Sequence, residues 1–173
     1  MSNTTAIEKN SINDDNASNV DIGVAKQQRV LVAEHLSKFL ATTYTLYMKS
    51  LYYHWNVTGQ NFHSLHNLFE EHYEDLHEAG DKIAERIRAL GHFAPGTFKE
   101  YQKFSKVQED ETVPNSADDM VRNLLADHET CSIEARSVLE QAKKAGDEVT
   151  IDMMVERMSV HDEAAWMLRS IIQ

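Results

Sequence analysis

Side chains that can bind a metal ion are concentrated in the middle of the chain. Two imidazoles and three carboxylates fall between residues 54 and 85, at His54, His66, Glu70, Asp81 and Glu85. Imidazole nitrogens and carboxylate oxygens together form a donor set that suits iron, which can change its oxidation state while it stays bound. The stretch therefore predicts an iron site.

Four of these residues share one predicted helix. No proline interrupts residues 61–90, and most residues there favour a helix. At about 100° per residue, His66, Glu70, Asp81 and Glu85 fall within an arc of roughly 100° on one side of that helix. However, His66 and Asp81 lie roughly 22 Å apart along the axis, at about 1.5 Å per residue. Metal–ligand bonds are only about 2 Å long, so one ion cannot contact both ends.

A second copy of the helix would bring the two ends together. The four positions are spaced symmetrically about the point between Asp75 and Leu76. Two antiparallel copies related by a two-fold axis at this point would place His66 opposite the partner's Glu85. Two-fold dimers are the commonest oligomers, and every contact across such an axis is made twice. The spacing predicts two identical metal sites at a dimer interface; the alternative is a solvated acidic face with unrelated histidines.

The same stretch resembles the Dps family of mini-ferritins. The resemblance covers the chain from about residue 24 and is carried by Tyr53, His54, Trp55, Asn56, Val57, Gly59, Asn61, Phe62, Leu65, His66, Asp81, Ala84, Glu85, Arg86, Leu90 and Gly91. It implies that His54, His66 and Glu70 come from one subunit and that the partner supplies Asp81 and Glu85. The best-known members usually have Asp at position 70, so Glu70 keeps the charge and adds a methylene.

This resemblance also implies a function. Members of the family oxidise ferrous iron, with hydrogen peroxide as the preferred oxidant, at a di-iron site between subunits. They store the ferric mineral inside a hollow dodecamer with tetrahedral symmetry. The chain is therefore expected to be a ferroxidase and iron-storage protein that protects against oxidative stress. Trp55, next to one ligand, is expected to serve packing first; a second hypothesis gives it a redox role.

A second acidic group lies at the start of the last predicted helix. Asp147, Glu148 and Asp152 cluster there. In the resembled family, acidic residues of this region line three-fold pores that admit iron, and Asp152 matches best. The alternative is that these charges only complement the dipole of the helix at its N-terminus.

Helices must position all of these residues. The spacing of apolar residues predicts one short helix between the second and third of four long ones, over residues 24–55, 61–90, 97–105, 116–146 and 147–172. Ser116 is a good N-cap for the third long helix, and Gly146 ends it. We therefore predict an all-α, ferritin-like four-helix bundle with a short extra helix in the crossover.

Composition limits the alternatives. The 173 residues are expected to form one domain over residues 24–173, after a flexible tail over residues 1–23 that is rich in Asn, Ser, Thr and Asp. The net charge of −11 opposes binding to DNA and favours cations. The single Cys131 suits a cytoplasmic protein, and no apolar run is long enough to span a membrane. Two rival functions are a DNA-coating nucleoid protein and a shell that holds zinc without turnover.

The second predicted helix carries further histidines besides His66. His63 lies near the ligand face, where a spare or transient ligand is one interpretation of it, and His72 is expected to be solvated. Glu74 and His77 have the Glu-x-x-His spacing of di-iron sites inside single four-helix bundles, but no later helix supplies a second pair.

The third long helix carries His128 and Cys131 one turn apart, which predicts core packing rather than a metal site. Close approach of a partner helix would explain Gly80 in the middle of the second helix; the alternative is that the helix simply tolerates the glycine.

Overall fold

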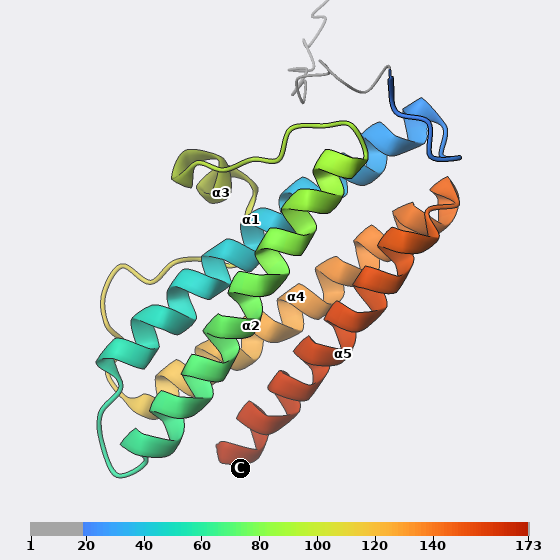
Figure 1. Cartoon of the computed structure of the whole chain (residues 1–173). Coiled ribbons are helices and arrows are strands. Elements are labelled where there is room, and N and C mark those ends of the chain that lie inside the picture. Colours follow the sequence, from blue (N-terminus) through green and yellow to red (C-terminus); the bar gives the residue numbers. More distant parts are fainter. Residues whose placement is uncertain (1–18, 173) are drawn as a thin grey trace, which may run out of the picture.

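The computed structural model describes residues 19–172 as five α-helices, without a strand in that range. They are α1 (Lys26–Asn56), α2 (Phe62–Ala89), α3 (Phe98–Phe104), α4 (Ala117–Ala145) and α5 (Glu148–Ile171). Helix α1 packs against α2, α4 and the short α3, and α4 packs against α5. The four long helices lie roughly along one direction, with α3 outside them (Figure 1). The predicted all-α bundle and its crossover helix are confirmed, with the observed ends within two residues of prediction.

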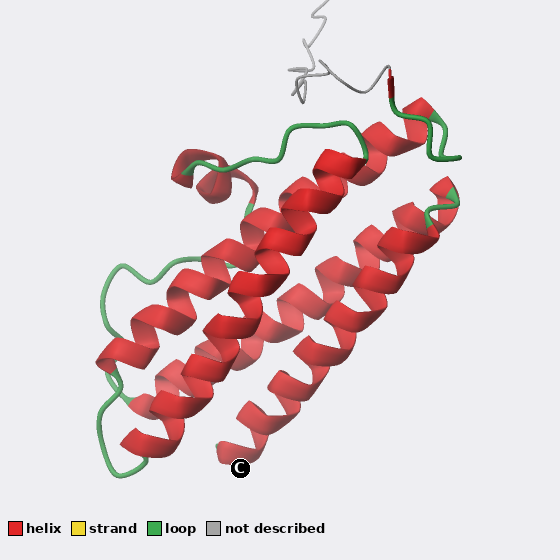
Figure 2. Ribbon diagram, viewed as in Figure 1, coloured by secondary structure: helices red, strands yellow, loops and turns green. Residues whose placement is uncertain are grey.

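Local sequence determines where several helices begin and end. The Thr97 side chain accepts a hydrogen bond from the backbone N–H of Glu100, whose carboxylate binds back to Thr97, so α3 begins with a capping box. The Ser116 side chain caps α4 by accepting from the N–H of Asp119. Helix α4 ends at Gly146, whose φ of 65° is a left-handed conformation that glycine adopts without strain. Figure 2 shows the loops that join these helices.

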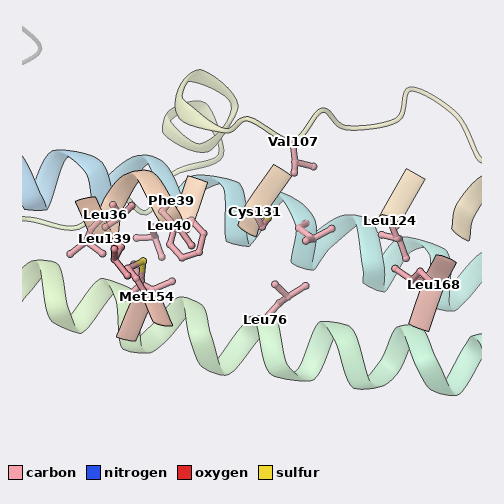
Figure 3. Packing of buried hydrophobic residues seen from close by; sticks show 14 of the residues in the cluster. Leu36, Phe39, Leu40, Leu76, Val107, Leu124, Cys131, Leu139, Met154 and Leu168 are labelled. Carbon is pink, nitrogen blue, oxygen red and sulfur yellow. The ribbon is translucent and has the colours of Figure 1, made fainter. Parts of the chain in front are cut away.

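The core lies between the four long helices. Each helix contributes fully buried side chains, and Figure 3 shows several of them, including Leu36, Phe39, Leu76, Leu124 and Met154. Burying one such side chain contributes about 1.5–3 kcal/mol relative to leaving it exposed. Cys131 is part of this core, which confirms its predicted packing role. Burial raises the pKa of its thiol well above the usual value, so it stays protonated.

A buried polar network ties the α2–α4 crossover to α1 next to the predicted metal site. The Lys49 ammonium group lies 2.8 Å from the Asp127 carboxylate and donates to the backbone oxygen of Gln108 at 3.1 Å. One turn later, the Tyr53 hydroxyl donates to the carboxylate of Asp110. Burial, and then this hydrogen bond, raise the pKa of Tyr53. The network fixes the end of α1, where His54 follows.

Gly80 is explained by its own subunit. A Cβ atom at this position would lie 2.9 Å from the ring of Tyr44, closer than real Cβ atoms come to a neighbour. The Tyr44 ring stacks on Tyr101 of α3, with centroids 5.1 Å apart and planes at 11°. The interpretation that a partner helix requires this glycine is therefore replaced by a contact within the chain.

Most of the predicted tail, residues 1–18, lies outside the described residues. None of the described helices is both long and apolar enough to cross a membrane.

Candidate metal centre

His54 and His66 hold each other in place. His54 lies in the last turn of α1 and His66 in the second turn of α2, after a short connection. The ring Nδ1 of His54 lies 2.9 Å from the backbone oxygen of His66, and the Nδ1 of His66 lies 2.9 Å from the backbone oxygen of His54. The two rings stack at 3.7 Å between centroids. A carbonyl oxygen only accepts hydrogen bonds, so each Nδ1 must carry the proton and each Nε2 keeps its lone pair for a metal ion.

Neighbouring rings restrict this pair further. Phe62 stacks on His66 with centroids 5.2 Å apart, and Tyr73 meets His54 edge-on at 5.2 Å. His54 is 9% exposed, whereas His66 is half-buried. The two rings are therefore packed against aromatic neighbours and partly shielded from solvent.

Glu70 lies one turn after His66 and faces the same part of the molecule. Its carboxylate accepts a hydrogen bond of 3.1 Å from the hydroxyl of Tyr73. Because Tyr73 also contacts His54, this tyrosine links the carboxylate to the histidine pair. The half-buried Glu70 therefore adds a carboxylate oxygen to the two imidazole nitrogens, and these are donor types that iron can bind.

Asp81 and Glu85 lie on the later turns of α2, and both are exposed. Burial, and then the negative charge of Asp81, raise the pKa of Tyr44, so that tyrosine is the carboxylate's neighbour in its own subunit. Within the described part of one chain, no three His, Cys, Asp or Glu side chains form a group that could hold a metal ion. The subunit thus brings His54, His66 and Glu70 to one end of α2 and leaves Asp81 and Glu85 towards the other.

Trp55 does not pack within its own subunit. Its side chain is 62% exposed, although both neighbours in sequence are at least partly buried. The expected packing role is therefore absent from the single chain.

The three acidic residues at the start of α5 differ in their exposure to solvent. Asp147 is buried and accepts hydrogen bonds from Arg86 at 2.5 Å and from the backbone N–H of Thr150 at 3.1 Å, which makes it the N-cap of α5. Its assignment as a candidate pore residue is wrong, because its carboxylate is occupied inside the subunit. Glu148 and Asp152 are exposed.

The other histidines on α2 also differ in their surroundings. His63 and His77 are exposed, and so is Glu74, so the Glu74–His77 pair lies outside the bundle and cannot form an internal di-iron site. His72 was expected to be solvated, and this is wrong, because it is buried. Its spacing from Phe69 and Leu76 on the apolar side of α2 is the signal that could have shown it.

Sequence reasoning missed the residues that orient the ligands. Tyr73 was not considered, although its position three residues after Glu70 puts the two side chains on one face of the helix. The mutual hydrogen bonds of His54 and His66 have no signal in the sequence, because they depend on how the α1–α2 connection folds.

Comparisons with known proteins agree with the observed fold. Residues 33–173 match the family model of the ferritin-like domain. "DNA protection during starvation protein 2" of Bacillus anthracis is 36% identical, over 82% of this chain and 96% of its own. A low temperature-induced protein of Nostoc is 40% identical, over 89% of this chain and 87% of its own. The crystal structure of a Dps protein from Vibrio cholerae, described as a ferritin-like diiron-carboxylate protein, superposes with a TM-score of 0.85 at 30% identity and covers 89% of this chain and 97% of its own.

Proposed function

The chain belongs to the Dps family of ferritin-like proteins, and from this premise we propose that it is a ferroxidase whose di-iron site lies between two subunits. Membership of this superfamily supports a general role in iron storage and in protection against oxidative damage. The site, the oxidant and the assembly are the finer parts of the proposal.

The pairing of His54 with His66 carries this proposal. Each Nδ1 is fixed by a backbone carbonyl at 2.9 Å, so both imidazoles keep Nε2 free for a metal ion in a single tautomer. Glu70, held by Tyr73, adds an anionic oxygen beside them.

The remaining ligands are proposed to come from a second copy of the chain. Asp81 and Glu85 are exposed on the same helix, at the spacing that a two-fold axis between Asp75 and Leu76 would pair with Glu70 and His66. A two-fold dimer would then form the site twice, each time from the histidine end of one α2 and the acidic end of the other. We extend this to a dodecamer whose hollow interior stores ferric mineral.

The proposed reaction oxidises ferrous iron as its substrate. Two ferrous ions each give one electron to hydrogen peroxide, whose O–O bond breaks, and two protons complete two water molecules. The three carboxylates favour the ferric product, because hard anionic oxygens bind the higher charge more strongly than the lower one. The net charge of −11 would raise the local concentration of ferrous ions around the protein.

Subunit complementation tests the shared site. One variant loses the histidine half, His54→Ala with His66→Ala, and the other loses the acidic half, Asp81→Ala with Glu85→Ala. We expect each alone to lose the rapid rise in ferric absorbance when anaerobic ferrous iron is mixed with peroxide. Random mixing of the two by co-expression would rebuild one intact site in each mixed dimer and restore about one quarter of the wild-type sites.

The outcome separates the possible arrangements. Full inactivity of the mixed protein, despite normal assembly, would show that each site belongs to one subunit. His77→Ala is the matched control, because His77 is an exposed histidine on the same helix outside the proposed ligand set. It should keep wild-type oxidation. A wild-type protein that binds iron without oxidising it would instead favour a sequestering shell.

A further inference from the structure

Three buried histidines that are not among the proposed interface ligands meet inside the bundle; one of them, His72, follows Glu70 by two residues and lies on the opposite side of α2. His72 of α2, His128 of α4 and His161 of α5 are 6%, 2% and 0% exposed. The ring centroids of His72 and His128 are 4.7 Å apart, and those of His128 and His161 are 5.2 Å apart. Helix α1 closes the group with Phe39, whose ring meets His161 edge-on at 6.3 Å. We call His72, His128 and His161 the core histidine cluster.

The cluster leaves several ring nitrogens without a hydrogen bond in the described part of the chain. These are both nitrogens of His72 and the Nε2 atoms of His128 and His161. A buried polar atom without a partner is unfavourable, and leucine at the same positions would pack without that cost. Three imidazoles from three helices therefore need an explanation other than core packing.

The closest nitrogens are already spaced for a shared ligand. The Nδ1 atoms of His128 and His161 face each other at 3.0 Å. A metal ion bound to both at about 2.05 Å would subtend an N–metal–N angle of about 95°, which lies within the range of real coordination. The alternative is one proton shared between the two rings, which would satisfy this pair but would leave His72 unexplained.

We propose that the core histidine cluster is a second metal site, which binds one divalent ion of the zinc and copper class within each subunit. Bundle proteins build metal sites in their cores from side chains on facing helices. A set of imidazoles without a carboxylate ligand favours zinc or copper over ferrous iron, which binds more weakly to nitrogen donors. The site would therefore be chemically distinct from the carboxylate-rich interface site.

One ring has to move to complete the site. No three ligand side chains of residues 19–172 already form a metal-binding group. His128 and His161 provide the first two donors, and rotation of the His72 ring about its Cβ–Cγ bond supplies the third. Because neither nitrogen of His72 makes a hydrogen bond, this rotation breaks none.

The charges around the cluster are compatible with a cation. Besides burial, the positive charge of Arg157 lowers the pKa of His128 and of His161, so it disfavours another positive charge at these rings. However, its guanidinium group makes two hydrogen bonds to the Asp75 carboxylate, at 2.9 and 2.6 Å, so the pair is close to neutral. Burial lowers the pKa of His72 to about 4 and that of His161 to about 3. The rings are therefore uncharged at neutral pH, as metal ligands must be.

Zinc content after removal of the interface site tests the proposal. The full-length chain with His54→Ala, His66→Ala, Asp81→Asn and Glu85→Gln is produced in zinc-supplemented cells, dialysed and analysed by elemental mass spectrometry. We expect about one zinc ion per subunit, and almost none after the further change His161→Leu or His72→Leu. The control is His35→Leu, which removes a half-buried histidine of α1 whose Nδ1 lies 2.8 Å from the backbone oxygen of Leu31.

Two other measurements keep the test decisive. Cobalt(II) replaces zinc in such sites, so the interface variant should show visible d–d absorption that His161→Leu abolishes. Leucine suits a buried apolar position, and circular dichroism would show that these variants fold. Peroxide-driven iron oxidation should be unchanged in His161→Leu with the interface ligands intact, which separates this proposal from the ferroxidase. Zinc content that is near zero before the histidine changes, or unaltered by them, would refute the core site.

Discussion

Arg86 of α2 and Asp147 at the start of α5 form a buried ion pair, with Nη2 and Oδ1 2.5 Å apart. The same carboxylate caps α5 through Thr150, whose side chain also accepts from the Nε atom of Arg86 at 3.0 Å. One side chain therefore fixes both the start of α5 and its position against α2.

Replacing this carboxylate should destabilise the fold. In Asp147→Asn the guanidinium of Arg86 loses its charged partner inside the protein, which costs about 3–5 kcal/mol for a buried pair. Thermal unfolding at a fixed protein concentration measures the loss. The matched change Glu148→Gln, at the exposed neighbouring position, should leave the midpoint nearly unchanged. Equal midpoints for the two variants would contradict the structural role of Asp147.

Gly80→Ala tests the contact with Tyr44. Alanine would favour the helix by about 1 kcal/mol, but its Cβ would lie 2.9 Å from a ring that Tyr101 holds in place. We expect the clash to dominate and to lower the free energy of unfolding by about 1–3 kcal/mol. Adding Tyr44→Ala should remove the penalty of the first change in a double-mutant cycle. A cycle without coupling would show that the glycine does not depend on this ring.

Trp55→Phe tests the redox hypothesis for the tryptophan beside His54. The exposed indole is expected to alter the oxidation intermediates but not the assembly. Stopped-flow absorbance during peroxide-driven iron oxidation, with the mass in solution as the assembly check, measures both. Trp166→Phe is the control, since Trp166 is also exposed (61%), lies on α5 and is not next to a proposed ligand in the sequence. Identical intermediates in wild type and Trp55→Phe would end the redox hypothesis.

Asp152→Asn tests the proposed route of iron entry. This carboxylate is exposed on α5, and we expect its loss to slow iron uptake into the shell while oxidation at the interface site is retained. Uptake under limiting ferrous iron gives the rate. Glu156→Gln, one turn later and also exposed, serves as the comparison. If both changes slow uptake equally, the effect is one of general charge rather than of a pore.

Acid should destabilise the metal-free protein through its core histidines. In the folded chain His72 has a pKa of about 4 and His161 one of about 3, whereas an unfolded histidine titrates near 6.5. Below pH 6.5 the unfolded chain therefore binds more protons than the folded one. The stability is complete at neutral pH and falls as the pH drops from about 6.5 towards 4, by up to about 1.4 kcal/mol per pH unit for each histidine.

Urea unfolding at a series of pH values, with a chelator present, measures this slope. His72→Leu should reduce it, since a leucine takes up no proton. If His72→Leu left the slope unchanged, His72 would not be a buried, uncharged side chain in the folded protein.

The sequence was sufficient for the helices because their determinants are local. The caps at Thr97 and Ser116, and the apolar spacing along each helix, are encoded within a few residues. The division of the proposed ligands between the two ends of α2 follows from helical rise alone. The structure could not complete that site, because the missing donors are proposed to come from another chain.

Long-range contacts explain what sequence reasoning got wrong. Asp147 looked like a free acid because Arg86, its partner, lies 61 residues away in the chain. Gly80 could not be linked to Tyr44 by any pattern along α2. The prediction that His72 is solvated was wrong for a different reason. It relied on the polar side chain and not on the position of His72 among the apolar residues of α2.

The separation of Asp81 and Glu85 from His54 and His66 has a consequence for the life of the protein. Under the proposed arrangement, a newly synthesised polypeptide carries all the iron-binding side chains but cannot form a complete site from them on its own. Iron oxidation would begin only after the subunits have assembled, so insoluble ferric mineral would not form on unassembled chains.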